Sequence, residues 1–161
     1  MKKVLITGGA GYIGTELANL LLEQEYEVTI YDTLMYDGSV LIPLFKHNNF
    51  LFVKGDILDK EKLSKAIKGK DVVIHLAAVV GYFACDKNKR LSTDINVTGT
   101  KNITECMNED QLLLFGSTGS NYGKVDGICL ETSPLNPSTL YGKTKTEAEE
   151  VVMMEHKNSI A

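Results

Sequence analysis

The stretch that decides the fold is Thr7-Gly8-Gly9-Ala10-Gly11-Tyr12-Ile13-Gly14. Gly8, Gly11 and Gly14 stand three residues apart, after the apolar run Val4-Leu5-Ile6 and before leucines at helical spacing. A glycine string between a buried strand and a helix is typical of a dinucleotide-binding turn. One glycine makes the tight turn, one lets the backbone approach a pyrophosphate, and one lets helix pack on strand. The alternative interpretation is a plain strand–helix turn.

The rest of the chain continues this alternation. We expect strands at 4–6, 28–31, 50–53, 72–74 (running towards Val80) and 112–115, and helices at 12–24, 60–68, 90–107 and from Ser138 to the end. Asn136-Pro137 is expected to start the last helix, and 33–48 to be a loop with at most a helical turn. Continuous apolar strands alternating with helices indicate a parallel sheet covered on both faces. We therefore predict one α/β domain over 1–161, a doubly wound parallel sheet of order 3-2-1-4-5.

Composition and charge exclude several classes of protein. The 17 Lys and Arg against 21 Asp and Glu give a net charge of −4, which argues against a nucleic-acid or anionic-membrane partner. No run of 18 apolar residues predicts a membrane span, and the short apolar start is no signal peptide, so we expect a cytoplasmic protein. The three cysteines are far apart and form no CxxC, so neither a disulfide framework nor a metal site is expected.

Asp32 indicates which dinucleotide the turn would take. It ends the second expected strand, where a carboxylate can accept hydrogen bonds from an adenosine ribose diol and would repel a 2′-phosphate. Residues 33–38 contain no Lys or Arg to hold such a phosphate. The sequence therefore predicts NAD rather than NADP as the cofactor. Asp56, after the third strand, could meet the adenine edge or merely cap a turn.

Tyr141 and Lys145 point to proton-transfer chemistry. They are four residues apart on an expected helix and therefore share a face. An ammonium group beside a phenol favours the phenolate. A tyrosine tuned in this way can remove a proton from a substrate hydroxyl while hydride leaves the same carbon. Taken alone, this spacing is also common on surface helices.

With these residues in view, the chain resembles the extended short-chain dehydrogenase/reductases, in particular the NAD-dependent nucleotide-sugar epimerases and dehydratases. The resemblance runs in order through nearly the whole chain. Its landmarks are the TGxxGxxG turn at 7–14, Gly55-Asp56-Ile57, His75-Leu76-Ala77-Ala78, Asn96-Val97-Thr98-Gly99-Thr100, the Ser/Thr segment Gly116–Gly123 that ends in Tyr-Gly, and the YxxxK segment 141–145. It implies a Rossmann-type NAD-binding domain.

The resemblance also implies roles for individual residues. Thr118 takes the place of the catalytic Ser/Thr, Tyr141 that of the acid/base, and Lys145 that of the residue that holds the nicotinamide ribose and tunes Tyr141. No metal is implied. The implied NAD-binding residues are Gly8, Gly11, Tyr12, Ile13, Gly14, Asp32, Asp56, Ile57, Leu76, Ala77, Ala78, Asn96, Tyr141 and Lys145.

One departure narrows the implied reaction. The family's sugar 4,6-dehydratases usually carry Asp-Glu directly after the catalytic Thr, whereas Gly119-Ser120 follow Thr118 here. This favours a nucleotide-sugar epimerase that works by transient oxidation at a sugar hydroxyl carbon. The alternatives are a net sugar dehydrogenase or reductase, a dehydratase of the same family, and a non-catalytic NAD-binding module.

A second departure is length. Family members continue into a smaller substrate domain, which is absent from a chain that stops at Ala161. We therefore expect a truncation after the YxxxK helix, and no activity from residues 1–161 alone. Helices 90–107 and 138–157 resemble the pair through which family members dimerise, which implies a homodimer.

Overall fold

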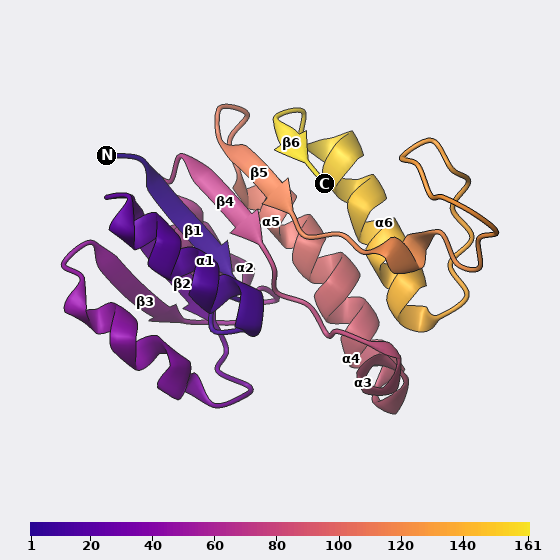
Figure 1. Cartoon of the computed structure of the whole chain (residues 1–161). Coiled ribbons are helices and arrows are strands. Elements are labelled where there is room, and N and C mark those ends of the chain that lie inside the picture. The colour runs from indigo at the N-terminus through magenta and orange to yellow at the C-terminus, as the bar shows by residue number, and fades with distance from the viewer.

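The computed structural model describes all of residues 1–161 and contains one six-stranded sheet, shown in Figure 1. Every neighbouring pair of strands is parallel, and their order is β3-β2-β1-β4-β5-β6. The strands are β1 (Lys3–Thr7), β2 (Glu27–Asp32), β3 (Phe50–Lys54), β4 (Val72–His75), β5 (Leu112–Phe115) and β6 (Ser159–Ile160). The expected strand order is confirmed, and β6 extends it by one strand.

Helices cover both faces of the sheet. They are α1 (Tyr12–Glu23), η1 (Gly38–Lys46), α2 (Lys60–Ile67), α3 (Tyr82–Lys87), α4 (Lys89–Thr93), the π turn η2 (Asp94–Gly99), α5 (Thr100–Cys106), η3 (Gly119–Asn121) and α6 (Leu140–Glu155). α1 and η1 pack on one face, while α2, α5 and α6 pack on the other (Figure 1). No helix has the length and apolar character needed to cross a membrane.

The two hydrophobic cores explain why the strands are continuous apolar runs. Successive side chains of a strand point to opposite faces of the sheet. Leu5 therefore joins the core beneath α2, α5 and α6, while Val4 and Ile6 join the core beneath α1 and η1. All three are at most 2% exposed. A doubly wound sheet leaves no polar face for β1.

Several element boundaries differ from those expected. Residues 38–46 form a 3-10 helix that is capped by Asp37, whose carboxylate accepts a hydrogen bond from the Ser39 amide. β4 ends at His75 instead of running towards Val80. The single helix expected at 90–107 is divided into α4, η2 and α5. The π turn holds Asn96, whose side chain binds both backbone groups of Val79, so a tertiary contact accompanies this change in helical pitch.

The last helix also differs at both ends. α6 begins after Thr139, whose hydroxyl accepts a hydrogen bond from the Gly142 amide at 3.0 Å, so the expected start at Asn136-Pro137 is wrong. α6 ends at Glu155 because the chain turns back to the sheet through His156. That ring is buried, and its Nε2 hydrogen-bonds the Gln111 carbonyl at 2.8 Å. β6 follows.

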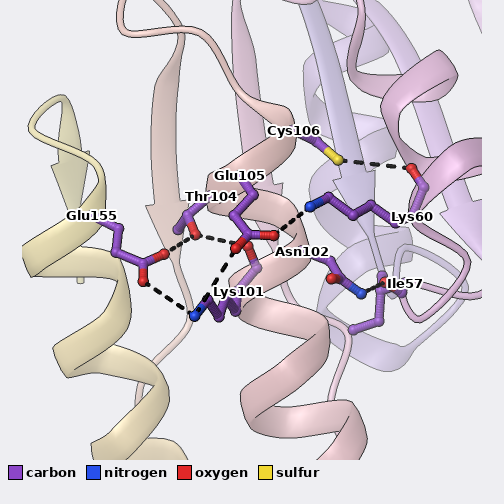
Figure 2. Close-up of polar contacts among 8 residues, drawn as sticks. All are labelled: Ile57, Lys60, Lys101, Asn102, Thr104, Glu105, Cys106 and Glu155. Carbon is purple, nitrogen blue, oxygen red and sulfur yellow. Dashed lines mark hydrogen bonds and ion pairs between the residues drawn. The ribbon is translucent and has the colours of Figure 1, made fainter.

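Polar contacts fasten the outer surface of α5 to its neighbours, as Figure 2 shows. Glu105 pairs with Lys60 of α2, and Lys101 lies 4.0 Å from both Glu105 and Glu155 of α6. These pairs are exposed, and such pairs contribute little to stability. Asn102 makes the more buried link, because its amide donates to the Ile57 carbonyl at 3.0 Å. These contacts join α5, which continues from the π turn that carries Asn96, to the helix α6, which carries Tyr141 and Lys145.

Candidate active site

The glycine turn between β1 and α1 has the compactness that its sequence predicts. Gly8 has φ +70°, and a Cβ there would lie 2.5 Å from the Ala77 amide nitrogen. A Cβ on Gly14 would lie 2.6 Å from the Gly9 Cα. Side chains at Gly8 and Gly14 are therefore excluded, and the first turn of α1 lies directly on the backbone of the glycine turn.

The start of α1 has the properties of an anion-binding site. Gly11 is its N-cap and supplies no side-chain hydrogen bond, and no acidic residue lies in the first turn. The amides and the positive end of the helix dipole are left to an external partner. Tyr12 and Ile13 are 91% and 64% exposed beside it.

Asp32 lies against this turn from the end of β2. Its Oδ2 accepts a hydrogen bond from the Ala10 amide at 3.1 Å, and its Oδ1 accepts one from the Leu34 amide at 2.8 Å. Each carboxylate oxygen can accept a further bond. A cradle that any Cβ would fill, an uncapped helix start and a carboxylate at the adjoining strand end together fit a dinucleotide with a free ribose diol.

Asp56 and Ile57 follow β3. The Asp56 carboxylate accepts a hydrogen bond from the Leu58 amide at 2.9 Å, so it caps a turn. The Tyr31 hydroxyl donates to the Asp56 carbonyl at 2.9 Å, and burial raises the pKa of Tyr31 to about 12. The Ile57 side chain is 4% exposed and packs against Gly99. Any contact of Ile57 with a cofactor would therefore come from its backbone.

The end of β4 is held by His75. Thr100 donates its hydroxyl proton to the Asn96 carbonyl at 2.6 Å, so it must accept from His75 Nε2, which lies 2.9 Å away. His75 Nδ1 then accepts from the Thr7 hydroxyl at 2.8 Å. Burial lowers the pKa of His75 to about 3, and the ring is neutral. His75 thereby fixes the start of the half-buried segment Leu76-Ala77-Ala78 beside Gly8.

Asn96 connects three parts of the structure. Its Oδ1 accepts from the Val79 amide at 2.8 Å, and its Nδ2 donates to the Val79 carbonyl at 3.1 Å and to the Thr144 hydroxyl at 3.0 Å. Thr144 in turn donates to the Tyr141 carbonyl at 3.1 Å. The Asn96 side chain is 1% exposed and fully engaged by protein groups. It ties the segment after β4 to the helix that carries Tyr141 and Lys145.

Tyr141 and Lys145 lie one turn apart at the start of α6. Tyr141 is half-buried, whereas Lys145 is only 4% exposed. The Lys145 ammonium lies 3.8 Å from the centre of the Phe115 ring, at the end of β5. Burial lowers the pKa of Lys145 to about 8, and the nearby charge of Glu149 opposes that change. Lys145 is therefore a buried cation at neutral pH that lies close to its titration point.

Thr118 lies in the loop after β5, directly before η3. Its hydroxyl accepts a hydrogen bond from the Ser120 amide at 3.2 Å. A Cβ on Gly142 would lie 2.8 Å from the Ser120 carbonyl oxygen, so this loop packs directly against the backbone next to Tyr141. The structure thus brings the segment that carries Thr118 to the helix that carries Tyr141 and Lys145.

Three residues of this region were missed from the sequence. Ser117 and Asn121 flank Thr118 at either side, and both bind the Glu149 carboxylate. Glu149 follows Lys145 by four residues, and this helical spacing is the signal that could have found it.

No group of three or more His, Cys, Asp and Glu side chains is arranged to hold a metal ion.

The chain is similar to known proteins over almost its whole length. The NAD dependent epimerase/dehydratase family matches residues 4–159. A putative UDP-glucose 4-epimerase from Methanocaldococcus jannaschii is 36% identical over 157 residues, which are 94% of this chain and 50% of that protein. The chain thus spans about half the length of this relative.

Two solved structures show the same similarity. The UDP-glucuronic acid 4-epimerase from Bacillus cereus, in complex with UDP-glucuronic acid and NAD, has a TM-score of 0.89 and 31% identity, over 97% of this chain and 52% of that one. DesIV, a dTDP-glucose 4,6-dehydratase from Streptomyces venezuelae with NAD and TYD bound, has a TM-score of 0.90 and 30% identity, over 96% and 52%.

Proposed function

The chain belongs to the NAD-dependent epimerase/dehydratase family, and we propose that it carries the cofactor-binding and proton-transfer half of a nucleotide-sugar epimerase. The reaction would proceed by transient oxidation at a sugar hydroxyl carbon. The observation that carries this proposal is the docking of the Thr118 segment on the first turn of α6. It brings the Ser120 carbonyl against Gly142, next to Tyr141, while the Lys145 ammonium lies over Phe115 at the end of β5, and this supports a shared site for Thr118, Tyr141 and Lys145.

The chain's own residues divide the work of binding and proton transfer. The glycine turn and Asp32 would hold the pyrophosphate and the adenosine ribose. Tyr141 would accept the proton of the sugar hydroxyl through its phenolic oxygen and later return it. Thr118 would orient that hydroxyl by a hydrogen bond. Lys145 would hold the nicotinamide ribose and favour the phenolate form of Tyr141.

These residues fit NAD as the cofactor. Bound NAD would supply reversible hydride acceptance from the sugar carbon, which would allow inversion of that carbon without net oxidation. The substrate class follows from the relatives, whose names include UDP-sugar epimerases. Gly119-Ser120 after Thr118 support epimerisation over dehydration, because no carboxylate stands there to remove water.

The test is to incubate the complete protein with NAD and a panel of UDP-, GDP- and dTDP-sugars in D2O. An epimer without deuterium at the inverted carbon would support the proposal, because the hydride would have returned to its own carbon. Accumulation of NADH would indicate net dehydrogenation. A product lacking one molecule of water would indicate a dehydratase. NAD binding without any turnover would indicate a binding module.

A further inference from the structure

A cluster of three polar side chains joins α6 to the segment after β5. Ser117 donates its hydroxyl proton to Glu149 Oε2. Asn121 Nδ2 donates to the same carboxylate oxygen at 3.0 Å and to the Ser117 hydroxyl at 3.1 Å. One carboxylate thus receives two donors from the two sides of Thr118.

The orientation of Asn121 is determined by its partners. Two acceptor atoms, the Glu149 carboxylate and the Ser117 oxygen, face one end of its amide, so that end must be the NH2 group. The residue is 3% exposed, and its Oδ1 is buried with no hydrogen-bond partner. A buried unpaired carbonyl is unfavourable. The bonds to Glu149 and Ser117 offset the cost of burying Asn121 in this position.

The cluster acts on the same segment that carries Thr118. The segment meets α6 at two heights, since the Ser120 carbonyl abuts Gly142 in the first turn and the Glu149 cluster lies two turns further along. On α6, Tyr141 lies next to the first attachment, and Lys145 lies between the two. A shift of the segment along or around α6 would therefore change the place of Thr118 relative to Tyr141.

We propose that Glu149 is a positioning residue, which sets the place of Thr118 relative to Tyr141 and Lys145 by binding Ser117 and Asn121. The inference rests on the proposed function. Glu149 makes no hydrogen bond with Tyr141 or Thr118, so its effect on the place of Thr118 passes through the backbone of 117–121. Its charge also acts on Lys145, and Ser117→Ala, which keeps that charge, separates the two effects. Misplacement of a reacting group by about 1 Å can cost on the order of 100-fold in rate, so weakening the contacts of Glu149 should have a measurable effect on kcat.

The experiment compares Glu149→Gln with Glu150→Gln in the complete protein. Glu150 is the next residue of α6, is exposed and lies outside the cluster. Gln at 149 keeps the size of the side chain and an oxygen that can accept from both donors, but it removes the negative charge that strengthens these two hydrogen bonds. We expect Glu149→Gln to lower kcat by about 10–100-fold. KM for the nucleotide sugar and Kd for NAD should stay within about threefold of the unsubstituted protein, since Glu149 binds neither.

Ser117→Ala provides a second variant that removes one partner and little volume. If Ser117 acts through Glu149, the loss of kcat in the double variant will be smaller than the product of the two single losses. Hydrogen exchange of the Asn121 and Tyr122 amides in residues 1–161 gives a readout without turnover. Those amides should exchange about tenfold faster in Glu149→Gln, as expected when two charge-assisted hydrogen bonds become neutral ones.

Three results would overturn the inference. One is equal kcat for Glu149→Gln and Glu150→Gln in a protein that turns over nucleotide sugar. Another is unchanged amide exchange at Asn121 and Tyr122. The third is a parallel loss of NAD affinity and kcat, which would indicate general damage to the fold. Failure of the proposed function gives a different result, because the unsubstituted protein would then turn over no nucleotide sugar.

Discussion

The Lys145 ammonium lies 3.8 Å above the centre of the Phe115 ring, with Lys145 only 4% exposed. A buried cation over an aromatic face is partly compensated for its lost hydration. The compensation is incomplete, because burial still lowers the pKa of Lys145 to about 8 from 10.5. Burial of this ammonium group, one helical turn from Tyr141, therefore lowers the stability of the folded chain.

The first prediction follows from that cost. Between pH 8 and pH 10.5 the unfolded chain holds the Lys145 proton and the folded chain has lost it. The buried charge of Lys145 therefore lowers the free energy of unfolding by its full amount below pH 8, and this loss disappears as the pH rises to 10.5. Lys145→Met should raise the free energy of unfolding at pH 7 by about 2–3 kcal/mol, and this gain should fade by pH 10.5.

Denaturant unfolding at several pH values measures this gain, with Lys143→Met as the matched control because Lys143 is exposed on the same helix. Calorimetry should show that Lys145→Met also loses NAD affinity. A variant that is less stable than the unsubstituted chain at pH 7 would contradict the prediction.

The second prediction concerns acid stability. His75 is neutral in the folded chain down to about pH 3, whereas it takes up a proton near pH 6.5 when unfolded. Between pH 6.5 and pH 3 only the unfolded chain holds this proton. The free energy of unfolding therefore falls as the pH falls through this range, by on the order of 4 kcal/mol. His75→Gln should lack this pH dependence. It should be less stable than the unsubstituted chain at pH 7, and the difference in the free energy of unfolding should shrink in acid.

Urea unfolding between pH 4 and pH 7 checks the prediction on His75. His47→Gln is the control, because that ring lies outside the network of Thr7, His75 and Thr100. A constant difference in stability between His75→Gln and the unsubstituted chain across this range would contradict the prediction.

The third prediction concerns cofactor choice. Asp32→Ala should weaken NAD binding by about 1–3 kcal/mol, the scale of a charge-assisted hydrogen bond. Asp32→Asn should narrow the preference for NAD over NADP, because it removes the charge that repels a 2′-phosphate while keeping an acceptor for the Ala10 or Leu34 amide. Calorimetry with both cofactors decides. Equal or tighter binding of NADP by the unsubstituted chain would show that Asp32 does not select the cofactor.

The fourth prediction concerns proton transfer. In the complete protein, Tyr141→Phe should lose about 10²–10⁴-fold in kcat yet still bind NAD, because the ring remains and only the proton-accepting hydroxyl is removed. Thr118→Val should cost less, since it removes an orienting hydrogen bond. Steady-state kinetics and calorimetry separate the two effects. A Tyr141→Phe variant with near-normal kcat would place the acid/base elsewhere.

The fifth prediction concerns association. We expect a homodimer through residues 90–107 and 138–157, with two-fold symmetry, which is the commonest symmetry of oligomers. Met154 is 81% exposed on α6, so Met154→Glu should shift the protein towards monomer in light scattering. Ile42→Glu, on η1 across the sheet and 69% exposed, is the matched control. A monomer at tens of micromolar would count against the dimer.

The sequence by itself determined the sheet and its ligand-binding turn. The glycine spacing at 8, 11 and 14 and the apolar runs are local signals, and each is interpretable from a few neighbouring residues. They predict a parallel order of 3-2-1-4-5, which the structure contains. The places of Tyr141 and Lys145 on one helix and of Asp32 at a strand end were predicted in the same way, because a spacing of four residues and the end of an apolar run are local signals.

Only the tertiary structure decided how these pieces are held. The π turn at Asn96, the end of α6 at His156 and the Glu149 cluster depend on partners between 17 and 48 residues away in the chain. No local pattern encodes such a contact. A side chain that stabilises by reaching a distant backbone or hydroxyl group has no periodicity of its own, so its role exists only once the sheet has brought those segments together.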